Sequence, residues 1–423
     1  MVFPIRDKIV SRETSISAVH EADSVTHNSP VITVNARGAA RLRGGHPWVY
    51  RSDLVTPVDA PAGALVHVRD QHGRRLGSAL YSAASQIAIR LLTGDEITEE
   101  QLPALLRERI AGAVEFRRQV VRHSDAHRVI FSEADLLPGL VVDRYNDVLA
   151  LQALTQAFNR DDLRRNVTDA LAELFPAASL IERVDPHIAE LEQLPMRPSQ
   201  LLRGGPTTTI FTMNGVCLHF DALCGQKTGA FLDQRENYAA AARYARGEAL
   251  DCFTYQGGFA LHLARVCQAV TAVDSSRAAL EVAEQNELLN REAHRCREIE
   301  WIEGNAFDLL RDYASAGRQY DAIVLDPPAF AKSIRAVPTA LRGYKELNLR
   351  ALKMLRPGGT LVTCSCSFHV SEAEFLDILA SAAADACRRV RVLENRGQAQ
   401  DHPVLLNVPE TAYLKCMICN IMH

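Results

Sequence analysis

Residues 326–330, Asp326-Pro-Pro-Ala-Phe330, combine residue types that could hold a planar ring. They follow the apolar run at 320–325, which predicts a buried strand of a parallel sheet. Two consecutive prolines cannot extend a strand ladder or enter a helix interior, so the chain must leave the sheet in a fixed turn. Open α/β sheets bind ligands at this carboxyl edge. The acid, the turn and the ring could therefore form a slot for a nucleobase, with an ordinary strand-end turn as the alternative.

A second group of residues could bind a cofactor. A predicted strand at 249–255 leads from Asp251 into the pair Gly257-Gly258, which opens a helix. Paired glycines let the backbone approach a ligand closely. The next predicted strand ends at Asp274, 23 residues after Asp251, where a carboxylate can accept both hydroxyls of a ribose. This spacing predicts an adenosine-type cofactor. NAD is the weaker choice, because the loop lacks the Gly-x-Gly-x-x-Gly pattern.

Both motifs lie in a region, 204–423, where strands and helices alternate. The alternation predicts an α/β domain with a doubly wound parallel sheet. Gly204-Gly-Pro206 is the candidate linker that precedes it. The predicted strands are 249–255, 269–274, 299–303, 320–325 and 360–364, and the predicted helices lie near 258–267, 276–291, 341–355 and 371–385.

Three further regions come before this sheet. Residues 1–30 are polar and irregular, which predicts a poorly ordered leader. Residues 31–102 show short strand-like runs separated by glycines, which predict a small β-barrel. Residues 103–203 hold an amphipathic helix at 103–122, strand-like runs and a helix near 161–174. They predict a small α+β middle domain.

The start of the barrel brings cations and rings together with no acid among them; these residues are Arg37, Arg41, Arg43, His46, Trp48 and Tyr50. Guanidinium groups suit phosphates, and rings stack on unpaired bases, so this stretch could bind single-stranded or looped RNA. The alternative is that Trp48 and Tyr50 belong to the core and the arginines are merely solvated.

Composition limits the partners. A formal charge of -4 argues against tight non-specific binding to long duplexes, so any nucleic-acid contact must come from a local patch. No run reaches the length of a membrane span and no signal-peptide pattern is present, so we expect a cytoplasmic protein without a membrane partner. All ten cysteines lie after position 216, which favours reduced thiols. Cys416 and Cys419 have no second pair at suitable spacing, so no metal is expected.

With these motifs established, residues 251–259, 326–330 and 365–366 resemble the ordered motifs of class I S-adenosylmethionine-dependent methyltransferases. Residues 225–235, Gly225-Gln-Lys-Thr-Gly-Ala-Phe-Leu-Asp-Gln-Arg235, resemble a motif of the RlmI-type 23S ribosomal RNA methyltransferases. The likeness covers most of the chain from about residue 35. It implies a Rossmann-like methyltransferase sheet, a PUA RNA-binding domain in place of the small barrel, and methylation of cytosine C5 in 23S rRNA.

The resemblance also implies a binding site for S-adenosylmethionine. Its residues would be Lys227, Thr228, Gly229, Phe231, Asp233, Gln234, Arg235, Asp251, Phe253, Tyr255, Gly257, Gly258, Phe259, Asp274, Ser275, Asn305, Ala306 and Asp326. Position 305, which is often Asp in such enzymes, is Asn here, and its amide could still bond an adenine edge.

Methylation at C5 implies a nucleophile, because C5 becomes reactive only after a thiolate has added to C6. Thr363-Cys-Ser-Cys-Ser367 supplies Cys364 and Cys366, and Cys366 is favoured because Ser365-Cys366 matches the motif and lies nearer the sheet edge. The alternative is that both are small buried residues. Asp326 would hold the base by its N3/N4 edge. In many RNA cytosine-5 methyltransferases a second cysteine follows Asp-Pro-Pro and assists release of the product. Ala329 occupies this position here, so the base that removes the C5 proton is unassigned.

The implied partner is 23S rRNA, free or in an assembling subunit, and a homodimer is a candidate assembly. One competing interpretation is an N-methyltransferase acting on a guanine or another base nitrogen, which would need no cysteine. The other is a non-catalytic RNA-binding assembly factor. Tolerance of Cys366→Ala would favour the first, and failure to bind S-adenosylmethionine would favour the second.

Overall fold

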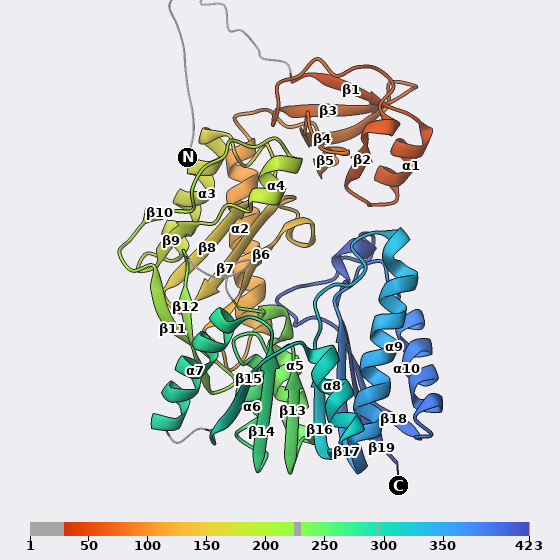
Figure 1. Ribbon diagram of the computed structural model, residues 1–423. Helices are drawn as coiled ribbons and strands as arrows, with labels where there is room; N and C mark the ends of the chain where they lie inside the picture. The colour runs from red at the N-terminus through yellow and green to blue at the C-terminus, as the bar shows by residue number, and fades with distance from the viewer. Residues whose placement is uncertain (1–28, 224–229, 294–295, 423) are drawn as a thin grey trace, which may run out of the picture.

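The computed structural model describes residues 29–223, 230–293 and 296–422. The strands form four sheets, and Figure 1 shows them in three groups along the chain: a small β-rich domain, a middle α+β region, and a large sheet flanked by helices. No helix within the described residues combines the length and apolarity that crossing a membrane requires.

The first sheet has five strands in the order β1-β3-β4-β5-β2. It is curled, and edge strand β1 also meets the segment after β2 through a bridge between Val34 and Leu54. Helix α1 (Ala36–Arg43) lies between β1 and β2 and was not predicted. Asn35 caps it by accepting a bond from the Gly38 amide, a common N-cap arrangement. The strands are β1 Val31–Val34, β2 Trp48–Tyr50, β3 Leu65–Asp70, β4 Arg75–Tyr81 and β5 Ile87–Thr93.

The second sheet, in the order β10-β9-β8-β7-β6, belongs to the middle region. Helices α2 (Leu102–Val120) and α3 (Asp161–Leu174) pack beside each other, and both were predicted, α2 from its amphipathic pattern. A short helix, α4 (Pro186–Leu191), follows. The strands are β6 Ala126–Phe131, β7 Leu140–Tyr145, β8 Val148–Ala153, β9 Ser179–Glu182 and β10 Gln200–Arg203.

A separate hairpin connects the middle region to the large sheet. Strands β11 (Thr208–Met213) and β12 (Val216–Asp221) pair only with each other among the named strands that the structure describes. Asn286 and Asn290 bind the backbone of β12, which attaches the hairpin to helix α7 (Arg277–Glu292). Among the described residues the hairpin is therefore bound to this helix without joining the large sheet.

The large sheet has seven strands in the order β15-β14-β13-β16-β17-β19-β18. Strands β13 to β17 are parallel, as predicted, and β19 runs antiparallel to its neighbours β17 and β18. The strands are β13 Glu248–Cys252, β14 Ala269–Asp274, β15 Ile299–Glu303, β16 Tyr320–Leu325, β17 Leu355–Ser365, β18 Val390–Arg396 and β19 Lys415–Ile421.

Helices cover both faces of this sheet (Figure 1). Helices α5 and α8 were not predicted, α6 ends earlier than predicted, and α9 begins earlier. The helices are α5 Arg235–Tyr244, α6 Gly258–Leu263, α7 Arg277–Glu292, α8 Ala306–Ser315, α9 Val337–Met354 and α10 Glu372–Asp385.

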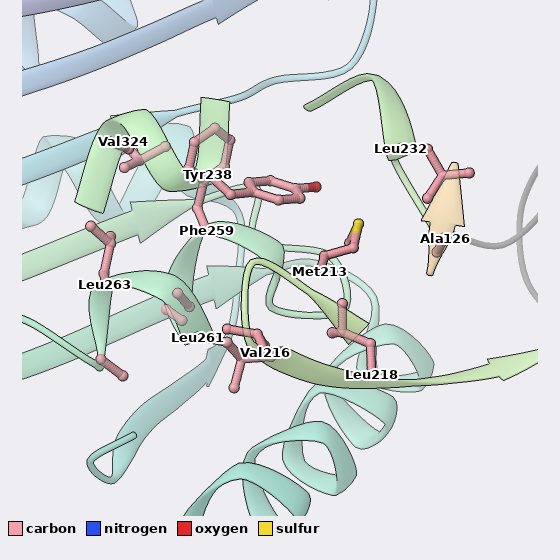
Figure 2. Packing of buried hydrophobic residues seen from close by; sticks show 14 of the residues in the cluster. Ala126, Met213, Val216, Leu218, Leu232, Tyr238, Phe259, Leu261, Leu263 and Val324 are labelled. Atoms are coloured by element: carbon pink, nitrogen blue, oxygen red, sulfur yellow. The ribbon is translucent and has the colours of Figure 1, made fainter. Parts of the chain in front are cut away.

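The central strands bury both faces, because alternate residues point to opposite sides. In β16, Ala322 and Val324 join the core beneath α5 and α6, whereas Ile323 and Leu325 join the core beneath α8, α9 and α10. Figure 2 shows the first of these cores, where Tyr238 and Phe259 meet Met213 from the hairpin. The continuous apolar run of each strand follows from this double burial.

Candidate functional site

A cavity of about 330 Å³ opens at the carboxyl edge of the large sheet. Its volume is within the range of pockets that bind small organic molecules. The lining comes from the loop after β13, the ends of β14, β16 and β17, helix α5 and the β11–β12 hairpin. Residues at these places, and in the turn that precedes α5, include Phe211, Met213, Leu218, Phe231, Asp233, Gln234, Tyr238, Phe253, Tyr255, Gly258, Phe259, Asp274, Ser275, Asp326, Pro327, Pro328 and Cys366.

Asp251 organises the loop between β13 and α6. Its Oδ2 accepts bonds from the Thr254 hydroxyl at 2.6 Å and from the Ala260 amide at 3.0 Å. The loop needs this support, because Phe253 and Tyr255 adopt positive φ angles of 66° and 51°. Complete burial raises the pKa of Asp251 to about 8, and the charge of Asp326 adds to that rise, while the Thr254 bond opposes it. Asp251 is therefore largely protonated at neutral pH.

Asp274 ends β14 and faces the same cavity. Its Oδ2 accepts from the Tyr255 amide and its Oδ1 from the Ser276 amide, each at 2.9 Å. These two bonds fix the carboxylate while leaving lone pairs on both oxygens, because each oxygen can accept more than one bond. The ring of Tyr255 stands edge-on to Phe231, with centroids 5.1 Å apart. Carboxylate and rings together form a pocket wall suited to a ribose and a planar base.

Gly258 is needed because an aromatic ring lies against its Cα. A Cβ at this position would lie 2.5 Å from Cζ of Tyr238. Tyr238 is buried and stands perpendicular to Phe259, with centroids 4.7 Å apart, so it has little freedom to move away. The glycine thus lets the cofactor-type loop and helix α5 approach each other closely.

Asp326, at the end of β16, is held by a chain of side-chain bonds. Gln234 Nε2 donates to Asp326 Oδ1 at 3.0 Å, and Asn237 Nδ2 donates to Gln234 Oε1 at 2.7 Å. Arg396 Nε in turn donates to Asn237 Oδ1 at 2.8 Å. Each bond fixes which end of the next amide is the donor. The chain therefore directs an N–H group at the Asp326 carboxylate.

Cys366 follows the last residue of β17 and lines the cavity together with Asp326 and Pro327. Its Sγ lies 3.9 Å from the Pro327 carbonyl oxygen. The next residue, Ser367, is fixed by the Ala331 amide and the Tyr344 hydroxyl, at 3.1 and 2.9 Å. Cys366 is thus a partly exposed thiol on a rigid strand end.

Cys364 has a different environment. It is fully buried, and its cross-strand neighbour is Cys416. Burial raises the pKa of the Cys364 thiol well above its ordinary value. Only Cys366 of the two predicted candidates faces the cavity.

Comparison with known proteins shows what this site resembles. The S-adenosylmethionine-dependent methyltransferase model matches residues 148–418, and a PUA-like domain model matches residues 32–94. Ribosomal RNA large subunit methyltransferase I of Serratia proteamaculans (strain 568) is 36% identical over 384 residues, 89% of this chain and 96% of the relative. The protein of the same name from Yersinia pseudotuberculosis serotype O:1b (strain IP 31758) is 36% identical over 401 residues, 93% of this chain and 99% of the relative. The chain belongs to the ribosomal RNA large subunit methyltransferase I family.

Solved structures support the fold of this methyltransferase. SMU.776, a methyltransferase crystallised with SAH, matches with a TM-score of 0.78 at 17% identity, covering 92% of this chain and all of that one. A methyltransferase from Streptococcus mutans gives a TM-score of 0.77 with the same identity and coverage. The predicted α/β methyltransferase fold with an N-terminal PUA-like domain is confirmed.

The cofactor of this methyltransferase is S-adenosylmethionine. The donor set fits it: Asp274 offers carboxylate oxygens suited to a ribose, Phe231 and Tyr255 offer rings for a base, and the loop after β13 approaches closely. Asp251 is fully buried and does not line the cavity, and its bonds to Thr254 and Ala260 hold the loop. Its role in the site is to position that loop.

Several other predicted cofactor residues lie away from the cavity. Arg235 is fully buried and pairs with Asp401 at 3.0 Å. Asn305 is exposed and caps α8 by accepting from the Phe307 amide, and Ala306 is buried in α8. Gly257 is the αL residue before α6, where a Cβ would meet Trp301. Lys227, Thr228 and Gly229 lie outside the described residues.

The predicted RNA-binding residues of the PUA-like domain are engaged within the protein. Arg37 and Arg41 both bind the buried Asp53, at 2.6 and 2.7 Å, and Arg43 pairs with Asp70. The guanidinium of Arg41 lies over the Tyr50 ring, with its Cζ 4.7 Å from the ring centroid. Trp48 Nε1 donates to Glu133 at 2.9 Å, and His46 lies 3.1 Å from Glu410. The contact of these residues with RNA stays a prediction. The charges of the three arginines are largely neutralised by Asp53 and Asp70.

Sequence reasoning missed several residues of the site. Asn237 and Tyr238 lie within one turn of the Leu-Asp-Gln-Arg motif on α5, and that proximity was an available signal. Phe211, Met213 and Leu218 reach the cavity from the hairpin, for which no local signal existed. Lys415 of β19 faces Ser365 across the ladder, and its ammonium donates to the Ser367 and Tyr413 carbonyls at 2.7 and 3.0 Å.

Proposed function

We propose that this methyltransferase transfers a methyl group from S-adenosylmethionine to C5 of a cytosine in 23S ribosomal RNA, through an adduct between Cys366 and C6 of the base. The observation that carries the proposal is that Cys366 lines the same cavity as Asp326 and the cofactor loop. The printed names of the relatives, which are ribosomal RNA large subunit methyltransferases, support the class of substrate.

The chemistry assigned to the chain begins with the thiol. Cys366 loses its proton, and the thiolate adds its electron pair to C6 of cytosine, which makes C5 nucleophilic. S-adenosylmethionine supplies the electrophilic methyl group. After the C5 proton has been removed, the Cys366–C6 bond breaks and the thiolate leaves. The ammonium of Lys415, bonded to the carbonyl of the neighbouring Ser367, places a positive charge that favours the thiolate.

Asp326 would hold the cytosine edge while the adduct forms. Its carboxylate is fixed by Gln234, so it is pre-organised for one orientation of the base. Ala329 lacks an acid–base group, so the C5 proton must leave through another group or water. The rings of Phe231 and Tyr255 and the turn at Pro327 and Pro328 exclude solvent from one side of the cavity.

Methyl transfer from labelled S-adenosylmethionine to unmodified 23S rRNA tests this function, with the product digested to nucleosides. We expect the label in 5-methylcytidine with the wild type and no label with Cys366→Ala. Label in a guanosine derivative that survives Cys366→Ala would instead support the N-methyltransferase. Absence of cofactor binding in the wild type would support an RNA-binding assembly factor. We also propose that the protein is cytoplasmic, which cell fractionation tests, and that it forms a homodimer, which light scattering tests.

A further inference from the structure

The segment that follows Asp326 is an acid-free stretch that begins with Pro327 and Pro328 in the lining of the cavity. From 327 to 345 the chain carries Lys332, Arg335, Arg342 and Lys345 and no Asp or Glu. Lys345 is paired with Asp385 at 2.7 Å. Within the described part of the chain, the other three have no carboxylate partner. We call Lys332, Arg335 and Arg342 the basic rim.

The basic rim differs from the arginines of the PUA-like domain. Arg37, Arg41 and Arg43 each face a buried or nearly buried aspartate, so a phosphate would have to compete with a carboxylate for them. The side chains of the basic rim are exposed and face no carboxylate among the described residues. Because unpaired cations are free to displace counterions from phosphates, they contribute more to RNA affinity than paired ones.

The basic rim is anchored next to the proposed nucleophile. The Ala331 amide, one residue before Lys332, donates to Ser367 Oγ at 3.1 Å, and Ser367 follows Cys366 directly. Phe330 packs on Tyr344 with centroids 4.8 Å apart, and Tyr344 bonds Ser365 and Ser367. Arg342 Nη2 donates to Thr339 Oγ1 at 3.0 Å, toward the start of α9. The chain on either side of the basic rim, at Ala331 and at Tyr344, is therefore bonded to the residues that flank Cys366.

An exposed ring completes this surface. Phe368, two residues after Cys366, is 48% exposed, and Ile334, between Lys332 and Arg335, is 76% exposed. Ser367 bonds the Ala331 amide, and Phe368 and Lys332 are the residues that follow this bonded pair. Exposed rings and cations in one region suit single-stranded nucleic acid, because bases stack while cations meet the backbone.

We infer that the basic rim binds the sugar–phosphate backbone of the rRNA strand flanking the target cytosine, with Phe368 stacking on an adjacent base. This rests on the proposed function, and it names the surface that delivers the base to Cys366. The PUA-like domain then acts elsewhere on the RNA.

The test compares two triple variants with equal loss of charge. The first is Lys332→Gln with Arg335→Gln and Arg342→Gln. The control is Lys353→Gln with Arg389→Gln and Arg391→Gln. These three cations of the same domain are exposed and lie near the ends of α9 and α10 and the start of β18. They have no carboxylate partner among the described residues. Binding of unmodified 23S rRNA is measured with S-adenosylhomocysteine present, across salt concentrations from about 50 to 200 mM.

We expect the basic-rim variant to bind RNA at least about tenfold more weakly at low salt. The slope of log K against log salt should become shallower by about 2, since three phosphate contacts are lost and each contributes about 0.7 in a single strand. The control should keep the wild-type affinity and slope. In the transfer assay the basic-rim variant should raise KM for RNA with little change in kcat. Phe368→Leu should weaken binding by about tenfold without changing the salt slope.

Equal affinity and slope for the basic-rim variant and the wild type would overturn the inference, as would equal losses in both triple variants. Failure of the proposed function has a different signature. In that case the wild type binds 23S rRNA no better than an unrelated RNA, or methylates a base other than cytosine. Calorimetry with S-adenosylmethionine checks that every variant keeps the folded cofactor site.

Discussion

Gln234 Nε2 donates a hydrogen bond to Asp326 Oδ1 over 3.0 Å, and Asn237 fixes the orientation of that amide from 2.7 Å on the other side. Asn237 itself does not line the cavity. Removing its donor in Asn237→Ala lets the Gln234 amide turn its oxygen toward Asp326, which disfavours the ionised carboxylate. We expect kcat to fall about tenfold, a loss on the scale of one positioned hydrogen bond.

The pH profile separates this positioning role from a structural one. When the Gln234 amide no longer donates to Asp326, the ionised form of this carboxylate is less favoured. The acid limb of kcat/KM should therefore move to higher pH in Asn237→Ala. The affinity for S-adenosylmethionine should stay the same. A lower kcat with an unshifted acid limb would show that Asn237 only supports helix α5.

The two cysteines at the end of β17 should respond oppositely to substitution. Cys366→Ala should abolish methyl transfer, whereas Cys364→Ala should keep it, with a loss of stability of about 1 kcal/mol from the small cavity created. RNA containing 5-fluorocytidine, which has no C5 proton to lose, should trap a covalent complex with the wild type and with Cys364→Ala. A trapped complex with Cys366→Ala would assign the nucleophile to another residue.

The sequence allowed much of this site to be predicted because its parts follow parallel strands. The carboxyl ends of β13, β14, β16 and β17 meet at one edge, so Asp274, Asp326 and Cys366 could be placed together from their order alone. The apolar runs of these strands are long enough to identify. Cys364 is buried in β17, whereas Cys366 follows the end of the strand at Ser365 and lines the cavity. The residue at which a strand ends cannot be read from the periodicity of the sequence.

Contacts between distant segments could not be predicted in the same way. The arginines of α1 look unpaired in the sequence because their partners, Asp53 and Asp70, come from the segment after β2 and from the end of β3. The hairpin residue Met213 reaches the cavity because bonds from distant segments hold the hairpin, among them those of Asn286 and Asn290 on α7 to β12 and that of Asp125 to Thr212. Such contacts depend on how the elements pack, which local patterns do not encode.

Asp251 should make stability depend on pH. Its pKa is raised from 3.8 to about 8 by burial, so between these values the unfolded chain has lost the proton that the folded chain keeps. The stabilisation is fully present below the unfolded pKa and is lost as pH rises toward the folded pKa, by up to about 1.4 kcal/mol per pH unit. In Asp251→Asn this slope should disappear, as urea midpoints measured from about pH 5 to pH 9 would show. Parallel profiles for the two proteins would contradict the raised pKa.

Gly258→Ala should disturb the cofactor site by overpacking. The new methyl group would lie 2.5 Å from Tyr238 Cζ, and the buried ring cannot rotate away. We expect a loss of about 1–3 kcal/mol in stability and weaker binding of S-adenosylmethionine. The double variant Gly258→Ala with Tyr238→Leu should recover part of the binding measured by calorimetry. If the single variant binds the cofactor like the wild type, the close approach is not required.

Arg235→Met tests whether this arginine stabilises the fold or binds the cofactor. Arg235 and Asp401 are both fully buried and 3.0 Å apart, and removing one partner leaves a buried charge, which costs about 3–5 kcal/mol. The control on the same helix is Arg243→Met, whose side chain is 62% exposed and pairs with Glu394, so its loss should cost less than about 1 kcal/mol.

The acid limb of stability distinguishes the two arginines further. Burial opposes ionisation of Asp401, but His402 and Arg235 outweigh it and hold the pKa of Asp401 below its usual range. This stabilisation is present above the unfolded pKa and is lost as pH falls through the folded pKa. Arg235→Met should therefore flatten the acid side of the stability profile, while Arg243→Met should leave it unchanged. Because Arg235 does not line the cavity, the folded variant should bind S-adenosylmethionine like the wild type, and a large loss of affinity would return Arg235 to the cofactor site.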